Sequence, residues 1–427
     1  MLDIQFIRDN KDVVQEKSKQ KGYEVDIKHL LELDNNRREL ITKVDELRQK
    51  RNEQAGQTKN QKPSKQQIAV GKELKEKIGA TEAELQKIDQ DYYKLLKQVP
   101  NMPLDDVPIG ASEDDNQIAK TVGEPPKFDF EPKNHAELAQ ALGWIDKERA
   151  AKVSGARFAY VKGDLAKLHF ALINWAISVV TDKETLQAIA TKAGLKVSTK
   201  PFTLVLPPLM IRTDMYDAMD RLEPREDRYK IEGEDLWLQG SAEHVLGSMH
   251  AGEVIDEADL PVRYVGYATS FRREAGSYGK DMEGIFRLHQ FEKLEMESLT
   301  SPEVALDEHL FMIAIQEHLM QELGLPYQVL NKCTADIGKP NAHGVDINTW
   351  LPAQKTYRET HTADYMTDYQ ARRLQTKLRR ADGQTELVHT NDATVLSQRP
   401  LIAIIENYQN QDGSIRVPEV LKPYLKV

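Results

Sequence analysis

Two long runs of apolar residues, spaced alternately three and four positions apart, constrain the fold of the first hundred residues more than any other feature of this sequence. The first run extends from Leu30 to Arg51 and the second from Leu74 to Val99. This spacing is the a/d seam of a coiled coil, and each run is longer than an average globular helix. Residues 54–67 between them (QAGQTKNQKPSKQQ) contain Gly and Pro and no apolar period, which indicates a turn. We therefore predict an antiparallel helical hairpin whose helices are each about 45 Å long.

Basic residues gather near the expected tip of this hairpin, with few acidic residues among them. They are Arg48, Lys50, Arg51, Lys59, Lys62 and Lys65. One interpretation is a tip that its charge keeps in solution, and the other is a lever that binds a phosphate backbone. No aromatic residue lies near the tip to stack on unpaired bases, so binding would depend on the shape and phosphates of a duplex.

The bulk composition limits the class of protein. The chain has 427 residues, enough for two or three domains, and its 40% hydrophobic and 30% charged residues are typical of a globular protein. A net charge of -10 argues against a general nucleic-acid coat protein, and we expect no DNA partner. No apolar run approaches ~18 residues, no signal-peptide pattern begins the chain, and the single Cys333 excludes an internal disulfide. We expect a cytoplasmic protein that does not bind membranes.

The composition changes after a connector rich in Pro and Asp near residue 108. Short runs with strand-like alternation follow, together with two long helical stretches at residues 166–194 and 301–324. The strand-like runs are residues 202–211, 261–273, 284–296, 345–352 and 401–408. Their order favours an antiparallel sheet backed by helices, which is an α+β fold. We expect a helical arm domain at 1–108 and an α+β domain at 109–427.

One expected strand pair, residues 271–296 (FRREAGSYGKDMEGIFRLHQFEKLEM), carries charges of both signs where a core strand would be apolar. Strand alternation puts Arg272 and Glu274 on one face, and it puts Arg287 and Phe291 on one face of the second run. The ordinary interpretation is a solvated face. Guanidinium groups that fit phosphates, beside a ring that can stack on a base, favour a nucleotide site instead. The sequence has no P-loop and no G-x-G-x-x-G after a strand, so ATP would bind on the sheet.

Together these segments resemble class II aminoacyl-tRNA synthetases, in the form of the bacterial seryl-tRNA synthetases. Residues 265–296 resemble motif 2 of that class, residues 202–211 with Pro208 resemble motif 1, and residues 390–409 with Arg399 resemble motif 3. VSGARFAYVKGDLAKL and VPEVLKPYL are similar to seryl-type signatures, and the hairpin is similar to the coiled coil that grips the long variable arm of the tRNA. The resemblance implies activation of L-serine with ATP and transfer of the seryl group to serine tRNA. It also implies a homodimer that forms through motif 1.

The resemblance assigns an ATP site. Arg272 would bind the α-phosphate, Glu274 the adenine amino group and Phe291 the adenine ring. Arg287 and Arg399 would bind the outer phosphates, and Arg272 and Arg399 would be the catalytic residues. The full expected ATP-binding set is Arg272, Arg273, Glu274, Arg287, Phe291, Glu359, Thr360, His361, Thr362 and Arg399.

The resemblance also assigns the other ligands. The Mg²⁺ that accompanies ATP would be held by Glu359 and Thr362. The expected serine-binding residues are Ser241, Ala242, Glu243, Glu295, Thr390, Ala393 and Thr394. The six basic residues at the tip of the hairpin would bind serine tRNA, and whether selenocysteine tRNA is also a substrate stays open.

Four segments depart from the family pattern. Ser241 replaces a usual Thr, residues 359–362 read ETHT in place of E-I-S-S, and Asn348 replaces a common acidic residue. The largest departure is NDATVLSQR, where N-G-S-G-x-x-x-x-R is expected, because Asp392 is bulkier than Gly and Ala393 lacks a hydroxyl. Two alternatives stay open: a catalytically impaired paralogue that acts as an RNA-binding or regulatory protein, and a ligase that charges a protein carrier. The basic tip of the arm argues against the carrier ligase.

Overall fold

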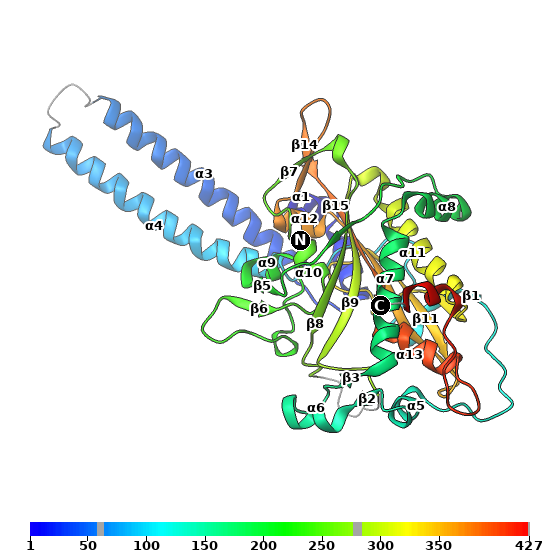
Figure 1. Cartoon of the computed structure of the whole chain (residues 1–427). Coiled ribbons are helices and arrows are strands. Elements are labelled where there is room, and N and C mark those ends of the chain that lie inside the picture. The colour runs from blue at the N-terminus through cyan, green and yellow to red at the C-terminus, as the bar shows by residue number, and fades with distance from the viewer. Residues whose placement is uncertain (58–63, 276–283, 426–427) are drawn as a thin grey trace. The chain divides into compact units, whose positions relative to one another are not determined.

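The structure, a computed structural model, describes residues 1–57, 64–275 and 284–425 (Figure 1). The chain divides into two compact units, Met1–Met102 and Pro103–Val427. The first unit is helical, and the second combines an antiparallel sheet with helices, so the predicted α+β fold with an N-terminal helical hairpin is confirmed.

The second unit begins earlier than residue 109 because the connector already bonds to it. The Leu104 amide donates a hydrogen bond to the Ala342 carbonyl at 2.9 Å. The Thr334 amide donates to the Pro108 carbonyl at 2.8 Å. These backbone bonds hold residues 103–108 against the segment between β10 and β11 of the second unit.

The first unit is built on two long antiparallel helices. They are α3 (Ile27–Gln57) and α4 (Lys65–Leu96). Two ion pairs cross between them: Arg37 Nε lies 2.5 Å from Asp89 Oδ1, and Arg48 Nη2 lies 2.8 Å from Glu82 Oε1. The apolar seam that the spacing predicted is buried at Leu40, Val44 and Ile78.

Local signals set the ends of these helices. Ser64 and Gln67 form a capping box at the start of α4, in which each side chain accepts a hydrogen bond from the other's backbone amide. Two short helices that the apolar spacing did not predict precede α3. They are α1 (Ile4–Asp9) and α2 (Lys11–Gln20). The buried side chains of Ile7, Val14 and Leu30 pack this end of the unit.

An eight-stranded sheet is the centre of the second unit. Its strand order is β1-β10-β11-β12-β15-β9-β8-β4, and every neighbouring pair is antiparallel except β4 and β8. The strands are β1 (Gln117–Val122), β4 (Thr203–Val205), β8 (Val262–Phe271), β9 (Gln290–Thr300), β10 (Tyr327–Asn331), β11 (His343–Leu351), β12 (Thr356–Thr367) and β15 (His389–Ser397).

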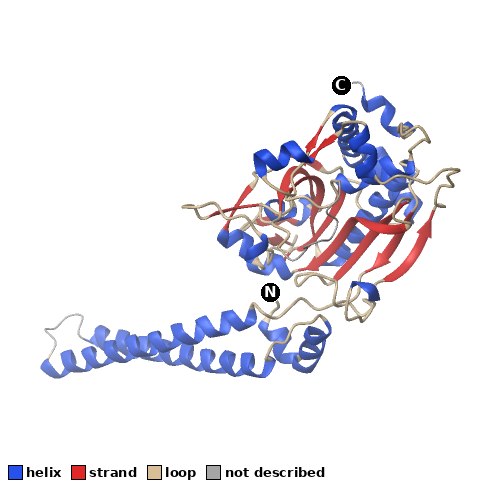
Figure 2. Cartoon of the chain, turned by 90° about the horizontal axis from the view of Figure 1, so that it is seen from below, coloured by secondary structure: helices blue, strands red, loops and turns tan. Residues whose placement is uncertain are grey.

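Helices cover one face of this sheet (Figures 1 and 2). They are α7 (Gly163–Val180), α8 (Lys183–Ala193), α11 (Ala305–Glu322) and α13 (Gln398–Asn407). Buried side chains of these helices, such as Leu172, Phe311 and Ile402, form one apolar core with Leu294 and Met296 of β9. Because strand side chains alternate, Glu295, which lies between Leu294 and Met296, faces the opposite side of the sheet, where polar groups can line a site.

Smaller elements surround the sheet. The helices are α5 (His135–Ala141), α6 (Lys147–Ser154), α9 (Thr213–Ala218), α10 (Glu243–Leu246) and α12 (Tyr369–Leu374). The strands are β2 (Ile145–Asp146), β3 (Tyr160–Val161), β5 (Met210–Arg212), β6 (Leu236–Leu238), β7 (Val254–Asp256), β13 (Lys377–Arg379) and β14 (Thr385–Leu387). In the part of the chain that is described, no helix is both long and apolar enough to cross a bilayer.

Two of the strand predictions are wrong. Residues 401–407 lie in helix α13, and Tyr408 is the residue at its C-terminal end. The helix begins after Ser397, whose hydroxyl accepts a hydrogen bond from the Arg399 amide at 3.3 Å. A short run that is apolar on all sides does not distinguish a buried helix from a buried strand. Residues 284–289 precede strand β9, so Arg287 lies in the loop before it rather than on the strand.

Candidate active site

A cavity of about 600 Å³ opens on the polar face of the sheet. Its lining includes Arg272, Arg287 and Arg399, which come from the ends of three separate elements. A smaller hollow of about 120 Å³ shares these arginines and adds the Phe291 ring and the Thr394 side chain. Three of the side chains expected to bind ATP from distant segments therefore line one hollow: Arg272, Phe291 and Arg399.

The turn after β8 holds the expected adenine-binding residues. Strand β8 ends at Phe271, so Arg272 and Glu274 lie in a turn, and Glu274 has a left-handed backbone with φ of 53°. The Arg272 Nε donates to the Gly240 carbonyl at 2.9 Å, and its guanidinium lies 5.4 Å from the centre of the Phe291 ring. Glu274 Oε2 accepts from Arg287 Nη1 at 2.8 Å. These contacts hold a planar cation next to a ring that can stack on a base.

Arg399 lies in the first turn of α13, where it faces Glu359. Its Nη1 is 2.9 Å from Glu359 Oε1, and its guanidinium lies 5.0 Å from the centre of the Phe286 ring. The Arg358 guanidinium lies 4.3 Å from the same ring. A pair of guanidinium groups beside one ring gives this end of the cavity a local positive charge although the chain as a whole is acidic.

A bulge in β12 brings Glu359 and Thr362 to the same face of the sheet. Residues three apart on a regular strand face opposite sides. Here Thr362 pairs with Asp346 and Glu359 pairs with Asn348, and the register shifts by one residue between them. Since Asp346 and Asn348 are two apart, all four side chains share the face that lines the cavity.

The extra residue of the bulge, Thr360, turns inward. Its hydroxyl lies 2.7 Å from the Thr349 hydroxyl, and its Oγ1 lies 2.9 Å from His361 Nδ1. Burial lowers the pKa of His361 to about 4, so the imidazole is neutral at neutral pH. Thr360 borders the smaller hollow, whereas His361 is not among the residues that line either cavity.

Oxygen atoms of the bulge region form a set that suits a hard cation. Burial raises the pKa of Asp346 to about 7, and Lys332 Nζ lies 3.7 Å from its Oδ1. The buried Oδ1 of Asn348 accepts no hydrogen bond. Together with the Glu359 carboxylate and the Thr362 hydroxyl, these groups provide only oxygen ligands, which is the chemistry that Mg²⁺ prefers.

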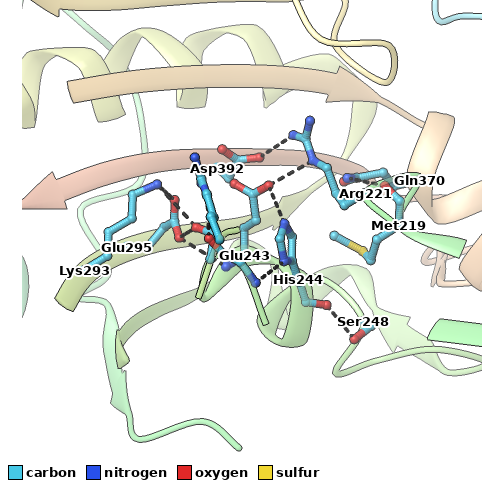
Figure 3. Close-up of polar contacts among 12 residues, drawn as sticks. Met219, Arg221, Glu243, His244, Ser248, Lys293, Glu295, Gln370 and Asp392 are labelled. Atoms are coloured by element: carbon cyan, nitrogen blue, oxygen red, sulfur yellow. Dashed lines mark hydrogen bonds and ion pairs between the residues drawn. The ribbon is translucent and has the colours of Figure 1, made fainter. Parts of the chain in front are cut away.

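Three carboxyl groups converge near Arg221 and Lys293 (Figure 3). One oxygen from each of Glu243, Glu295 and Asp392 lies within 4.8 Å of the others. Glu295 is fully buried, pairs with the Lys293 ammonium and accepts a hydrogen bond from the Ser241 hydroxyl. It also accepts from the Glu243 amide at 3.2 Å. We call Glu243, Glu295 and Asp392 the carboxyl cluster.

The cation Arg221 joins two members of the carboxyl cluster. Its Nε lies 2.9 Å from Glu243 Oε1, and its Nη2 lies 3.4 Å from Asp392 Oδ2. Burial opposes ionisation of Glu243, but Arg221, His244 and Lys293 together outweigh it and hold the pKa of Glu243 well below its usual range. Burial, Glu243 and Asp364 raise the pKa of Asp392. Burial lowers the pKa of His244 to about 4, and its Nε2 lies 3.4 Å from Glu243 Oε1.

The expected serine-binding residues are placed on two sides of the sheet. Ser241, Glu243 and Glu295 meet at the carboxyl cluster, as described above. Thr394 pairs with Glu295 across β15 and β9 and lines the smaller hollow. Ala393 instead packs in the apolar core, and Ala242 packs in a small cluster with Leu246 and Ala268.

The expected Thr390 and Arg273 make their contacts elsewhere. The Thr390 hydroxyl donates to Gln370 Oε1 at 3.0 Å, so it is already bonded within the protein. The Arg273 amide donates to the Asp227 carbonyl, and its guanidinium lies 5.9 Å from the centre of the Tyr229 ring. Arg273 is not among the residues that line either cavity.

The basic residues of the hairpin are only partly described. Lys50, Arg51 and Lys65 are exposed on α3 and α4. Arg48 is exposed as well, although it pairs with Glu82. The remaining two expected contacts, Lys59 and Lys62, lie outside the described residues.

The sequence interpretation did not single out Arg221 or Lys332. Both are cations held by acidic side chains of the cavity. Asp392 in place of an expected Gly was a signal that a buried acid would need a cation. The position of that cation, 171 residues away in the sequence, depends on the fold.

Comparisons with known proteins agree along the whole chain. Residues 1–103 match the family model for the seryl-tRNA synthetase N-terminal domain. Residues 227–408 match the family model for the tRNA synthetase class II core domain (G, H, P, S and T).

Full-length relatives and solved structures are also similar. A serine–tRNA ligase of Clavibacter sepedonicus is 40% identical, and the match covers 100% of this chain and 96% of that protein. A serine–tRNA ligase of Nitrosopumilus maritimus is 36% identical, and the match covers 100% of this chain and 99% of that protein. The structure of seryl-tRNA synthetase from Pyrococcus horikoshii complexed with ATP matches with a TM-score of 0.87 and 35% identity, over 100% of this chain and 98% of that one. The structure of cytoplasmic serine–tRNA ligase from Naegleria fowleri in complex with AMP matches with a TM-score of 0.81 and 28% identity. That match covers 97% of this chain and 94% of the other one.

Proposed function

The chain belongs to the seryl-tRNA synthetase family of class II aminoacyl-tRNA synthetases, and on that premise we propose that it activates L-serine with ATP and transfers the seryl group to serine tRNA. The family resemblance carried by the sequence motifs is thereby confirmed. The observation that supports the activity most directly is the shared hollow lined by Arg272, Phe291 and Arg399. A catalytically impaired paralogue would have no need to keep this arrangement.

In the first step, a carboxylate oxygen of serine attacks the α-phosphorus of ATP, and the bond to the departing pyrophosphate breaks. The reaction needs no nucleophilic side chain. It needs alignment of the two reactants and neutralisation of negative charge that spreads over the phosphate oxygens. We assign Arg272 to the α-phosphate and Arg287 and Arg399 to the outer phosphates, which their common place in the lining of one cavity supports.

In the second step, a ribose hydroxyl at the 3′ end of the tRNA attacks the carbonyl carbon of seryl-adenylate, and AMP leaves. The hydroxyl proton passes to the departing phosphate or to solvent, so the protein again supplies position rather than a covalent intermediate. We propose that Ser241 and Glu243 hold the α-ammonium group of serine and that Glu295 lies close to the substrate and its hydroxyl, since the three residues meet at the carboxyl cluster.

We further propose that ATP binds with Mg²⁺ at Glu359 and Thr362. The bulge in β12 gives these residues one face with Asp346 and Asn348, and this oxygen-only set fits the ion. When bound, Mg²⁺ neutralises phosphate charge and favours departure of pyrophosphate. Asn348 keeps an oxygen ligand at the position where the family usually has an acid.

We propose that the helical hairpin binds the tRNA and that motif 1 forms a homodimer. Exposed basic side chains at the described part of the tip, including Arg51 and Lys65, suit a phosphate backbone. The segment around motif 1 exposes large apolar side chains, with Leu206 at 79% and Met210 at 45% exposed. We place the protein in the cytoplasm. Selenocysteine tRNA remains a second candidate substrate for the same charging assay.

Serine-dependent exchange between ATP and pyrophosphate tests the proposed activation. The purified full chain should exchange label with L-serine and much less with L-alanine or L-threonine. Charging of serine tRNA then tests transfer. Tight tRNA binding without any exchange would instead establish the impaired paralogue, and exchange without tRNA charging would favour the ligase that acts on a protein carrier.

A further inference from the structure

We propose that Asp392 is a specificity-determining residue that hydrogen-bonds the side-chain hydroxyl of the bound amino acid, and that Arg221 is the residue that positions it. The inference rests on the proposed function and deepens it. It assigns a substrate contact to the segment that departs most from the family pattern, NDATVLSQR, and a role to an arginine in a distant segment.

The first argument is an unsatisfied buried oxygen. Asp392 is only 1% exposed, and its Oδ1 has no hydrogen-bond partner among the residues that the structure describes. Its Oδ2 faces Arg221 Nη2 at 3.4 Å. A buried carboxyl oxygen without a partner costs free energy, so a ligand that donates a hydrogen bond to Oδ1 stabilises the complex.

The second argument is direction. Along β15, Ala393 packs in the apolar core, so its neighbours Asp392 and Thr394 face the other side of the sheet. Asp392 pairs with Glu297, and Thr394 pairs with Glu295, across β9. The Asp392 carboxyl group therefore lies beside Glu243 and Glu295, each of which has an oxygen within 4.8 Å of one of its own.

The third argument concerns the kind of ligand. Two members of the carboxyl cluster already have cations, since Glu243 pairs with Arg221 and Glu295 pairs with Lys293. The cluster is therefore nearly neutralised by the protein, which does not favour a divalent metal ion there. A hydroxyl group that donates one hydrogen bond fits the unpartnered Asp392 Oδ1, and serine differs from alanine by that group alone.

Arg221 positions this contact because it reaches both carboxyl groups. Figure 3 shows its guanidinium beside the carboxyl groups of Glu243 and Asp392, in contact with both. Its Nη2 also donates to Asn341 Oδ1 at 3.3 Å. Without this cation, Glu243 and Asp392 would repel each other and would be free to turn away from the bound amino acid.

Burial and the neighbouring acids raise the pKa of Asp392, so the group keeps its proton to a higher pH than a free aspartate. A protonated carboxyl group both accepts and donates, as the amide of asparagine does. Asp392→Asn is therefore the conservative variant, and Asp392→Ala removes the contact.

The test compares serine with alanine in ATP–pyrophosphate exchange by the full-length protein. Exchange by the wild type with serine is measured first, and its absence would refute the proposed function and this inference with it. In Asp392→Ala we expect kcat/KM for serine to fall about 10- to 100-fold, mainly through KM, while the value for alanine changes less than about threefold. Asp392→Asn should keep most of the preference for serine. An unchanged ratio of serine to alanine in Asp392→Ala, with wild-type exchange intact, would overturn the inference alone.

Arg221 is tested by coupling. Arg221→Met alone should raise KM for serine by a similar factor, because Glu243 and Asp392 lose their common cation. The double variant Arg221→Met with Asp392→Asn should be less impaired than the product of the single effects, since a neutral amide needs no cation. Effects that simply multiply would refute the positioning role. Arg379→Met, at an exposed ion pair with Asp256, is the matched control and should behave as the wild type.

For any variant that loses ATP–pyrophosphate exchange activity, ligand binding is measured directly. Calorimetry with non-hydrolysable seryl- and alanyl-sulfamoyl adenosine compares the two side chains without chemistry. We expect the wild type to bind the seryl compound more tightly and Asp392→Ala to bind both about equally. Circular dichroism melts verify that each variant is folded. A preserved preference of folded Asp392→Ala for the seryl compound would reject the contact.

Discussion

At the residue level, the site depends on side chains that are fixed before any ligand arrives. Arg272 is bonded to the Gly240 carbonyl and lies over Phe291, and Arg399 is bonded to Glu359. Groups that are held in place do not have to reorganise when charge develops on a phosphate. The protein therefore pre-forms the cationic part of its ATP site from its own contacts.

Arg272→Lys should separate the value of a planar guanidinium from that of its charge. Lysine keeps the charge but loses the fork that binds phosphate and the fixed bond to the Gly240 carbonyl. We expect kcat for serine-dependent exchange to fall about 100-fold or more. Arg379→Lys on the surface is the control. Activity within about threefold of the wild type would contradict the assigned role.

A buried histidine pair should make stability depend on pH. His309 Nε2 lies 3.0 Å from His343 Nδ1, and burial lowers the pKa of His309 to about 3. The unfolded chain protonates this group near pH 6.5, so below that pH the unfolded state binds the extra proton and stability falls. His309→Gln should lose less stability than the wild type between pH 7.5 and 5, by up to about 1.4 kcal/mol per pH unit.

Urea unfolding of both proteins at the two pH values measures this effect. His29→Gln, which replaces an exposed histidine of the first unit, should keep the pH dependence of the wild type. Parallel curves for the wild type and His309→Gln would show that the pair does not couple folding to protonation.

Predictability at this scale has a clear physical limit. The types of Arg272, Glu274, Phe291 and Arg399 indicated a nucleotide site because few other ligands use guanidinium groups and a stacking ring together. The partner of Asp392 was not predictable in the same way. An ion pair between residues far apart in the sequence exists only once the fold has brought Arg221 to it.

At the element level, spacing predicted the long helices and four strands of the eight-stranded sheet, which are β4, β8, β9 and β11, whereas β1, β10, β12 and β15 were missed. The three-and-four spacing identified α3 and α4 because a two-stranded seam buries a narrow stripe. Alternation identified β8 and β11. Helix α13 was missed because residues 400 to 405 form an unbroken apolar run, with the polar residues of the helix only at its two ends. Such a short run carries no periodic signal that distinguishes a helix from a strand.

Shortening the hairpin should separate tRNA charging from serine activation. Replacing residues 45–81 with a short Gly-Ser linker keeps the ion pair between Arg37 and Asp89. We expect tRNA charging to fall more than about 100-fold, since the basic tip is lost. Serine-dependent exchange should change little.

Two assays on the same preparation decide this. The matched control keeps the hairpin at full length and replaces only Arg51 and Lys65 with Ala, which should weaken charging without affecting the helices. Loss of exchange in the shortened protein would mean that the hairpin also supports the catalytic unit.

At the level of the whole molecule, the two units have different kinds of stability. The first unit relies on one seam between two long helices, and the second on a continuous core that helices and sheet share. Composition alone predicted more than one domain, and the boundary differed by only a few residues because the connector bonds to the second unit. The proposed homodimer, in contrast, is indicated in a single chain only by an exposed apolar surface.

That sign is the apolar surface around motif 1, and it predicts how the dimer can be broken. Leu206→Glu puts a charge where a second copy would bury an apolar side chain. We expect sedimentation velocity to show weaker dimerisation than in the wild type. Val153→Glu, a change at another exposed apolar residue, should leave the association unchanged. If Leu206→Glu and Val153→Glu dimerised equally well, Leu206 would not lie in the dimer interface.

Because of the bulge at Thr360, the side of the sheet that each residue of β12 faces depends on the number of residues in the strand. Deleting this one residue leaves Glu359 and Thr362 in the sequence, yet it turns Glu359 to the opposite side of the sheet from Thr362. Chemical similarity of the segment is therefore a poor guide to whether a distant homologue retains the site. The number of residues between Glu359 and Thr362 is the better one.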